Sequence, residues 1–213
     1  MRVRNIAGVE ELLKSNNYYI DLNEKIAINW ELVFGNKNPI HLEIGMGKGK
    51  FLTTLATENP EVNYVGIEKS KELLWKVCKL LEGTGLKNIR IINQKAEELQ
   101  ETFGQGEIER IYLNFSDPWP KARHDKRRLT HRGFLQKYKE ILKIEGEIHF
   151  KTDSLSLFEF SLEEFKEYKG LVLKEVTYDL HKEEPLDNVM TEYEEKFVSM
   201  GKPIYKYIAQ VEK

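Results

Sequence analysis

The sequence predicts an α/β fold: a mostly parallel sheet with helices on both faces and an antiparallel hairpin at one edge. Short apolar runs alternate along the chain with segments whose apolar residues recur at helical spacing. Such alternation is typical of parallel strands joined by covering helices. The last two apolar runs have no evident helix between them, which favours an antiparallel edge hairpin. A chain of 213 residues can bury one sizeable core, so residues 1–213 are expected to form a single domain.

The first half of the chain predicts three strand and helix units. The expected strands are residues 40–44, 63–68 and 88–93, and the expected helices are residues 50–58, 70–82 and 96–103. Each strand is a short apolar run, and the first one ends at Gly45. The first helical pattern stops before Pro60, and the second stops at Gly83, which begins a Gly-Thr-Gly breaker.

The second half continues the pattern and brings the expected number of strands to seven. The expected strands are residues 108–115, 147–151, 171–178 and 203–211, and the expected helices are residues 132–142 and 154–168. Residues 1–35 precede the first strand and form an N-terminal extension. Arg2 and Arg4 lie in this extension, so we expect it to pack on or near a face that binds a polyanion.

Composition excludes several classes of protein. No window approaches the roughly 20 apolar residues of a membrane helix, and the first residues lack an apolar stretch of signal-peptide length. We therefore expect a soluble protein of the cytoplasm. Cys78 is the only cysteine, which rules out an internal disulfide and argues against a cysteine-based metal site, so no metal is expected. Its apolar neighbours Leu74, Val77 and Leu81 place it on a buried helix face.

The charge of the chain is unevenly distributed. The formal net charge is -2, but residues 117–132 hold six Lys or Arg against two Asp, a local charge of +4. The rest of the chain therefore carries about -6, and a basic segment on an acidic body can steer a polyanion to one face. This segment begins with Asp117-Pro-Trp119-Pro directly after the apolar run 111–115. A carboxylate and an indole at a strand end could hold a planar, hydrogen-bonding base, while the cations contact phosphates.

A second group of candidate residues also follows predicted strands. Ligands of open α/β sheets bind at the carboxyl ends of strands, where the strand order reverses. Glu43 begins the glycine-rich turn that contains Gly45 and Gly47, and Glu68 ends the second strand 25 residues later. A carboxylate at this distance from a glycine turn can accept hydrogen bonds from both hydroxyls of a ribose. Glu43 would repel a pyrophosphate, so a positively charged nucleoside such as S-adenosylmethionine suits the pocket better.

With these motifs in order, the chain resembles the bacterial single-subunit tRNA (guanine-N7)-methyltransferases. The resemblance covers nearly the whole chain. Its motifs are residues 43–49, Asp117 to Leu129, Thr191-Glu-Tyr-Glu-Glu-Lys-Phe197 and Gly201-Lys-Pro-Ile-Tyr205. It implies the class I methyltransferase fold, which is Rossmann-like, S-adenosylmethionine as methyl donor, and a guanine in the variable loop of tRNA as acceptor.

The resemblance also implies roles for single residues. Cofactor contacts would come from Glu43, Gly45, Gly47, Glu68, Lys95, Ala96 and Asp117. The nucleotide would be held by Lys121, Asp153, Thr191, Glu192, Tyr193 and Glu194, and the RNA backbone by Arg123, His124, Asp125, Lys126, Arg127 and Arg128. Asp117 would lie between cofactor and guanine as the catalytic residue. The family often has a small or acidic residue where this chain has Lys95.

The residue types agree with this chemistry. Guanine N7 carries a lone pair and no proton, so its methylation needs no general base, and positioning should supply most of the catalysis. Asp117 can favour the positive charge that develops on the guanine ring, or accept hydrogen bonds from guanine N1 and N2. Trp119 either stacks on the base or fills a hydrophobic gap. His124 and His131 are interpreted as phosphate contacts or helix-start residues.

Three other interpretations stay open at this point. The Asp-Pro-Trp sequence is similar to the motif of amino-group methyltransferases, such as those acting on adenine N6, although Pro120 departs from its order. The glycine turn and Glu68 also suit a nicotinamide-dependent oxidoreductase, which has no use for Glu43 or the basic segment. A non-catalytic RNA-binding module would use only residues 121–132. The chain could act as a monomer or a homodimer.

Overall fold

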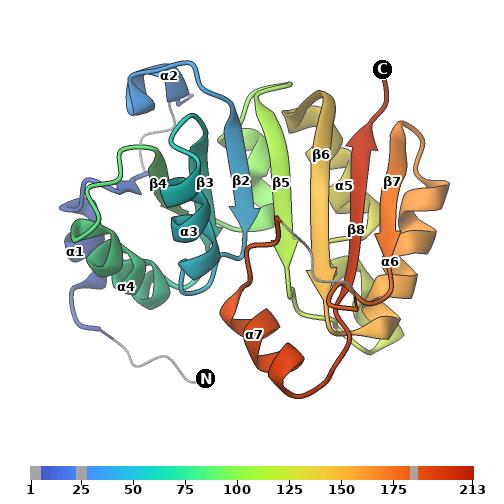
Figure 1. The fold of residues 1–213 in the computed structure, drawn as a ribbon. Helices are drawn as coiled ribbons and strands as arrows, with labels where there is room; N and C mark the ends of the chain where they lie inside the picture. Colours follow the sequence, from blue (N-terminus) through green and yellow to red (C-terminus); the bar gives the residue numbers. More distant parts are fainter. Residues whose placement is uncertain (1–5, 23–27, 183–186) are drawn as a thin grey trace.

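The centre of the protein is an eight-stranded sheet, seen in a computed structural model that describes residues 6–22, 28–182 and 187–213. The strand order is β1-β4-β3-β2-β5-β6-β8-β7 (Figure 1). The strands are β1 Tyr19–Ile20, β2 Ile40–Ile44, β3 Asn63–Glu68, β4 Ile89–Asn93, β5 Ile108–Asn114, β6 Leu142–Thr152, β7 Leu171–Thr177 and β8 Tyr205–Val211. Every neighbouring pair is parallel except β8 with β6 and with β7.

The mostly parallel sheet and its antiparallel edge confirm the fold expected from the sequence, with one change in strand count. The additional strand is β1, whose two residues pair with Ile91 and Ile92 at the outer side of β4. So short a strand has too few residues for an alternating pattern to stand out in the sequence. β6 is also longer than expected, because it begins at Leu142, directly after a helix.

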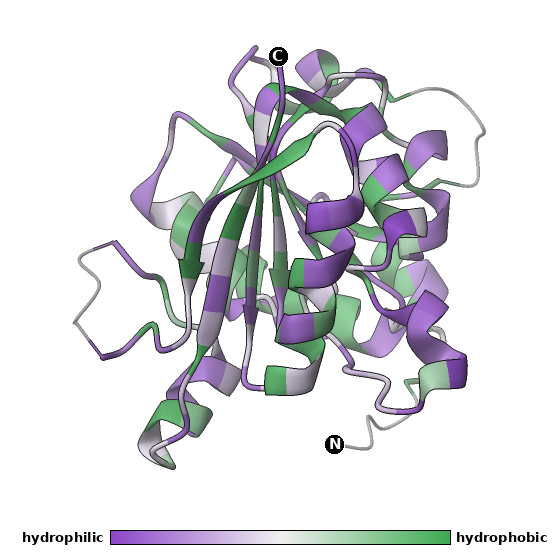
Figure 2. Cartoon of the chain, turned by 90° about the vertical axis from the view of Figure 1, so that its right-hand side faces the viewer, coloured by the Kyte–Doolittle hydropathy of each residue, from purple (hydrophilic) through white to green (hydrophobic). Residues whose placement is uncertain are grey.

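Helices cover both faces of the sheet (Figure 1). The helices are α1 Val9–Lys14, α2 Trp30–Phe34, α3 Lys50–Glu58, α4 Lys71–Glu82, α5 Arg132–Ile141, α6 Leu155–Glu167 and α7 Glu192–Ser199, with 3-10 helices η1 Ala96–Glu101 and η2 Ala122–Arg127. One face carries α3 and α4, and the other carries α5 and α6 (Figure 1). Seen from the β7 side, most hydrophobic residues lie in the strands and on helix faces turned toward them (Figure 2).

Each face of the sheet has its own hydrophobic core. α3 and α4 contribute Leu52 and Cys78 to one cluster, and both side chains are fully buried. Burial raises the pKa of the Cys78 thiol to about 12, which agrees with the packing role expected for it. The second cluster is larger and includes Phe158 and Phe165 of α6 with Tyr207 of β8. The two cores hold the sheet between its helical layers and fix the positions of the strand ends.

The segments before β2 differ from a plain extension. α1 packs on α4, and α2 lies at the end of the sheet opposite to α7 (Figure 1). Residues 1–5, with Arg2 and Arg4, and residues 23–27 lie outside the described residues, so the placement of residues 1–35 near an RNA-binding face stays a prediction. Within the described part of the chain, no helix is long and apolar enough to cross a membrane.

The strand order reverses between β2 and β5. From β2 the chain moves outward through β3 to β4, and it then returns to place β5 on the other side of β2. In open α/β sheets ligands bind beyond the carboxyl ends of the strands at such a reversal, here the ends of β2 and β5. α7, which the sequence analysis did not anticipate as a helix, lies at this same edge (Figure 1).

Candidate active site at the carboxyl edge of the sheet

The glycine turn follows β2 directly and has a left-handed backbone. Gly45 and Gly47 have φ angles of 78° and 56°, which favour glycine because a side chain would be strained there. A Cβ atom added at either position would meet no protein atom within 4 Å. The space beside the turn is therefore open, and the backbone can be approached closely by a ligand.

Glu43 is the buried carboxyl group of this site. Its side chain is at the end of β2, where Oε1 accepts a hydrogen bond from Asn114 Nδ2 of β5 at 3.0 Å. Oε2 is buried and has no partner among the described residues. Burial raises the pKa of Glu43 to about 7, against the opposing effects of the Asn114 hydrogen bond and the Lys151 charge. A cationic ligand would give Oε2 a partner and favour the ionised carboxylate.

Glu68 connects the glycine turn to the start of α4. One carboxylate oxygen accepts from Gly47 N at 3.2 Å, and the other accepts from Ser70 N at 3.0 Å. The side chain is 8% exposed. Each oxygen keeps a second lone pair, so Glu68 can still accept from ribose hydroxyls while its position is held by the backbone.

Lys95 and Ala96 lie beyond β4, at the start of η1. Lys95 is the exposed N-cap residue of that helix, and Ala96 is buried at 9% exposure. Their order along the edge, next to the end of β3, agrees with the adenine side of a nucleoside pocket. The contact of Lys95 with a cofactor stays a prediction.

Asp117 emerges from β5 on an unusual backbone. Phe115, two residues earlier, has a φ angle of 50°, which is rare for an aromatic residue, and its N–H still pairs with Lys151 O at 2.8 Å. Asp117 is exposed, and its carboxylate has no hydrogen bond within the described residues. It is therefore available to a ligand at this edge of the sheet, and its place between cofactor and base stays a prediction.

The basic segment after Asp117 folds back on itself as η2. Lys121, Arg123, Lys126 and Arg127 are exposed, whereas His124, Asp125 and Arg128 are partly buried. Trp119 has one ring contact with Arg127, whose guanidinium lies 4.9 Å from the ring centroid, and one edge contact with His124. One face and one edge of the indole thus contact its own segment, and stacking of Trp119 on a base stays a prediction.

His131 has the helix-start role that was one of its two interpretations. It is the N-cap residue of α5, and its Nδ1 accepts a hydrogen bond from Gly133 N at 3.1 Å. Its ring also stacks on Phe160 of α6.

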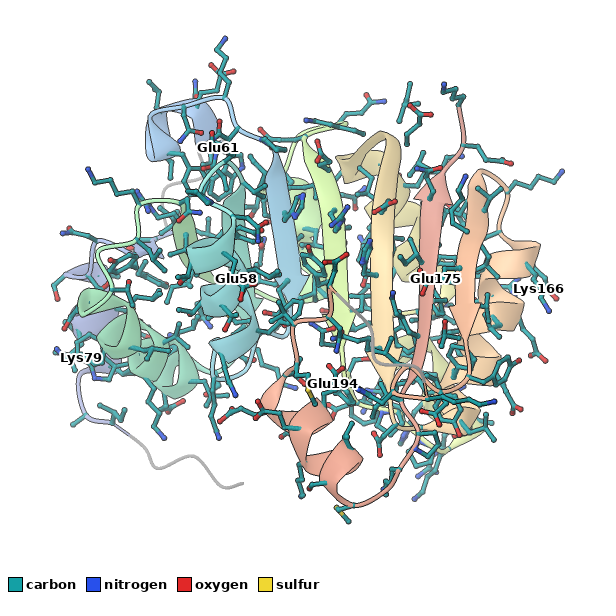
Figure 3. The ribbon with its side chains drawn as sticks, viewed as in Figure 1. Glu58, Glu61, Lys79, Lys166, Glu175 and Glu194 are labelled. Carbon is teal, nitrogen blue, oxygen red and sulfur yellow. The ribbon has the colours of Figure 1, made fainter. Side chains whose placement is uncertain are left out.

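Glu194 is at the centre of a buried network that fixes α7. Its side chain lies beside α7 (Figure 3) and is fully buried. It accepts hydrogen bonds from Lys151 Nζ at 2.6 Å and Asn188 Nδ2 at 2.7 Å, with His181 Nε2 at 2.9 Å. It also closes a capping box with Thr191. Burial alone would raise the pKa of Glu194, but the Lys151 ammonium and these donors lower it. Contact of Glu194 with a nucleotide stays a prediction, because its partners here are protein groups.

The other predicted nucleotide-binding residues are arranged around α7. Glu192 pairs with Lys48 of the glycine turn at 3.0 Å, and Asp153 accepts from Lys202 at 3.4 Å. Tyr193 is 60% exposed and stacks on Phe115. Thr191 is 7% exposed and serves as the helix cap, so its hydroxyl already bonds to Glu194 N at 3.0 Å. The fold thus brings α7, the glycine turn and the loop that follows β5 and carries Asp117 (the β5 exit loop) together at one edge.

Sequence reasoning missed two residues of this site. Asn114 orients Glu43, and its own Oδ1 is buried with no partner among the described residues. Lys151 at the end of β6 anchors α7 through Glu194. Both are polar residues at the carboxyl end of an apolar strand, and that position was the signal that could have identified them.

The arrangement fits a cationic nucleoside and offers little to a metal. Glu43 Oε2 and Asn114 Oδ1 are two buried acceptors with no partner in the described part of the chain, and an ammonium group would supply the donors that they lack. Among the described residues, no group of three or more His, Cys, Asp or Glu side chains could hold a metal ion.

Comparison with known sequences gives matches over the whole chain. A family model described as "Putative methyltransferase" matches residues 37–207. The tRNA (guanine-N(7)-)-methyltransferase of Alkaliphilus oremlandii is 56% identical over 212 residues, which cover 100% of each chain. The protein of the same name from Bacillus velezensis is 51% identical over 204 residues, or 92% of this chain and 93% of that one.

Comparison with solved structures confirms the class I methyltransferase fold. The 16S rRNA methyltransferase KamB gives a TM-score of 0.62 at 14% identity and covers 100% of this chain and 97% of its own. SMU.1697c of Streptococcus mutans, solved in complex with SAH, gives a TM-score of 0.54 at 16% identity, covering 87% of this chain and 99% of that one. At such identities the likeness concerns the fold alone.

Proposed function

This chain belongs to the bacterial tRNA (guanine-N(7)-)-methyltransferase family, and from that membership we propose that it transfers a methyl group from S-adenosylmethionine to N7 of a guanine in the variable loop of tRNA. The observation that carries the proposal is full-length identity above 50% to two relatives of that name. Neither relative is named for amino-group methylation, and oxidoreductase chemistry has no place in the family. The site fits the same reaction. We propose tRNA as the partner and the cytoplasm as the place of action from the relatives' names.

The cofactor side of the reaction would be handled by the ends of β2 and β3. S-adenosylmethionine, when bound, supplies a methyl group activated by its sulfonium. Glu43 would accept from its ammonium group, because Oε2 is buried and no residue that the structure describes donates to it. Glu68, fixed by the N–H groups of Gly47 and Ser70, would accept from the ribose hydroxyls. Ala96 would line the adenine.

The guanine side would be handled by the β5 exit loop and α7. N7 has a lone pair and no proton, so no side chain has to remove one during the transfer. Asp117 would orient the guanine by accepting from N1 and N2, and its charge would favour the cationic product. Alignment of the two reactants accounts for much of such an acceleration, up to roughly 7 to 11 kcal/mol in favourable cases.

The RNA would be recognised through its backbone. Lys121, Arg123 and Lys126 are exposed and have no acidic partner within the described residues, so they remain available to phosphates. A guanine that undergoes chemistry has to leave its stack, and the crevice beside Asp117 would receive it. Whether the enzyme works as a monomer or a homodimer is measurable by light scattering at assay concentration.

The test is incubation of purified protein with unmodified tRNA transcript and methyl-labelled S-adenosylmethionine, followed by nucleoside analysis. Label in 7-methylguanosine, lost with Asp117→Ala although that variant keeps its melting temperature, is the expected result. Label in N6-methyladenosine would mean that the methyl acceptor is the amino group of adenine and not guanine N7. Binding of tRNA without release of S-adenosylhomocysteine would reduce the protein to an RNA-binding module.

A further inference from the structure

Arg128 differs from the other cations of the basic segment in what it contacts. Its Nε donates to Pro118 O at 3.1 Å, and its Nη2 donates to Trp119 O at 3.0 Å. The guanidinium therefore bonds to two consecutive carbonyl groups of the chain, ten and nine residues earlier. These carbonyls belong to the two residues that follow Asp117.

The same guanidinium is held from the other side by α6. Its carbon lies 4.2 Å from the centroid of the Phe160 ring, a cation–π contact. The planar fork can donate in its own plane and stack through its face at the same time, which an ammonium group cannot do. Arg128 thus connects the rigid helical layer to the loop that carries Asp117.

The loop needs such support because its backbone is strained. Trp119 has a φ angle of 41°, in the left-handed region that bulky residues rarely adopt. Strained conformations of this kind persist only where surrounding contacts enforce them. The hydrogen bond from Arg128 to Trp119 O is one of these contacts, and the ring contact of Arg127 with Trp119 is another.

We propose that Arg128 is a positioning residue for the methyl transfer, not a phosphate contact as the sequence analysis expected. By holding the carbonyls of Pro118 and Trp119 against Phe160, it sets the exit direction of Asp117 from β5. Phosphate binding falls to the exposed cations Lys121, Arg123 and Lys126. This inference rests on the proposed function for the role of Asp117. The clamp itself, meaning the contacts of Arg128 with Pro118 O, Trp119 O and the Phe160 ring, is independent of that function.

The decisive variant is Arg128→Lys, which keeps the charge and loses the fork. A phosphate contact would tolerate this change, because lysine also binds phosphate. A positioning residue would not, and a displacement of about 1 Å can reduce the rate about 100-fold. The expected result is a single-turnover rate at saturating tRNA and S-adenosylmethionine that falls by about 10- to 100-fold, with unchanged tRNA affinity.

The chain offers a matched control in Arg90. Its guanidinium donates to Ile89 O at 2.7 Å and to Val33 O at 3.1 Å, and it lies 5.2 Å from the Phe34 ring. These contacts resemble those of Arg128, but they lie next to α2, at the opposite end of the sheet from α7 (Figure 1). Arg90→Lys should lower the melting temperature without changing the rate. An equal loss of rate in both variants would overturn the inference.

The salt dependence of tRNA affinity also distinguishes a positioning residue from a phosphate contact. Arg128→Ala should leave the slope of log K for tRNA against log salt unchanged, whereas Lys126→Ala should reduce it by about 0.7 to 0.9. A reduced slope with Arg128→Ala, or a wild-type rate with Arg128→Lys, contradicts the proposal.

A third measurement needs neither tRNA nor activity. Without the clamp the segment should loosen, so trypsin should cleave after Lys121, Arg123, Lys126 or Arg127 faster in Arg128→Lys than in wild type or Arg90→Lys. If the wild-type protein makes no 7-methylguanosine but the variant is cleaved faster, the proposed function fails while the clamp stands. Equal cleavage rates would mean that Arg128 does not hold the loop.

Discussion

Replacement of Glu43 by glutamine should make the protein more stable and less able to bind its cofactor. The native fold raises the pKa of this buried carboxyl to about 7 from an ordinary value of 4.5. The native state therefore keeps a proton that the unfolded chain has already released, and stability is lost as the pH rises between these two values. The difference corresponds to about 3 kcal/mol at pH values above the native pKa. Glutamine removes this penalty and retains an oxygen that accepts from Asn114.

The assay is urea unfolding of wild type and Glu43→Gln from about pH 4.5 to about pH 8. The free-energy difference in favour of the variant should grow across this range, toward about 3 kcal/mol, and level off above about pH 7. All other titrating groups are common to both proteins, so the difference isolates Glu43. Glu163→Gln, at an exposed position of α6, gives the baseline for removing one negative charge.

Binding supplies the other half of the test. S-adenosylmethionine affinity should fall with Glu43→Gln, because the ammonium loses its anionic partner, and wild type should release protons when it binds near pH 7. Calorimetry in buffers of different ionisation enthalpy measures this release. A stability difference that does not change with pH would refute the burial argument, since Glu43 would then ionise without penalty.

Three further predictions concern the loop, α7 and the glycine turn. Lys126→Ala should weaken tRNA binding and leave S-adenosylmethionine binding unchanged. An equal loss of both affinities in titrations would contradict the assignment of the basic segment to RNA and not to the cofactor. Lys151→Met removes the ammonium partner of the buried Glu194 and leaves it the Asn188 and His181 side chains, which should cost about 3 to 5 kcal/mol in urea unfolding near neutral pH. Adding Glu194→Gln should recover part of this loss, and no recovery would contradict the charge argument. Gly66→Ala would force a Cβ against Met46 Sδ, and the expected loss of about 1 to 3 kcal/mol should shrink with Met46→Ala.

The sequence was sufficient to predict most of the sheet, because buried strands appear in it as short apolar runs. β2 and β3 are buried along their full length, and the short, mainly apolar runs at these positions, alternating with helical patterns, predicted them as parallel strands. The carboxyl ends of those runs then marked Glu43 and Glu68. Elements with no such pattern were missed, among them the helices α1 and α2, the two-residue β1, and α7, whose acidic first turn resembles a solvated loop.

The sequence could not predict which side chains contact each other. Glu194 was expected to meet a nucleotide, yet its carboxylate meets Lys151, which is 43 residues earlier in the chain. No local pattern links the two residues, because only the placement of α7 across the end of β6 brings them together. Asn114 was likewise visible only as a polar residue near the end of the expected strand 108–115, without its bond to Glu43.

The basic segment shows why equal charges in a sequence need not be equal in a structure. Lys126 and Arg128 lie two residues apart and count the same in any sum of charge, but one is exposed and the other donates to two carbonyls. An exposed cation contributes to RNA affinity through counterion release, which depends on salt and hardly on geometry. A cation that holds a strained loop contributes through geometry, which salt hardly changes. A reaction at a proton-free nitrogen depends chiefly on alignment, so the second kind of residue should control its rate.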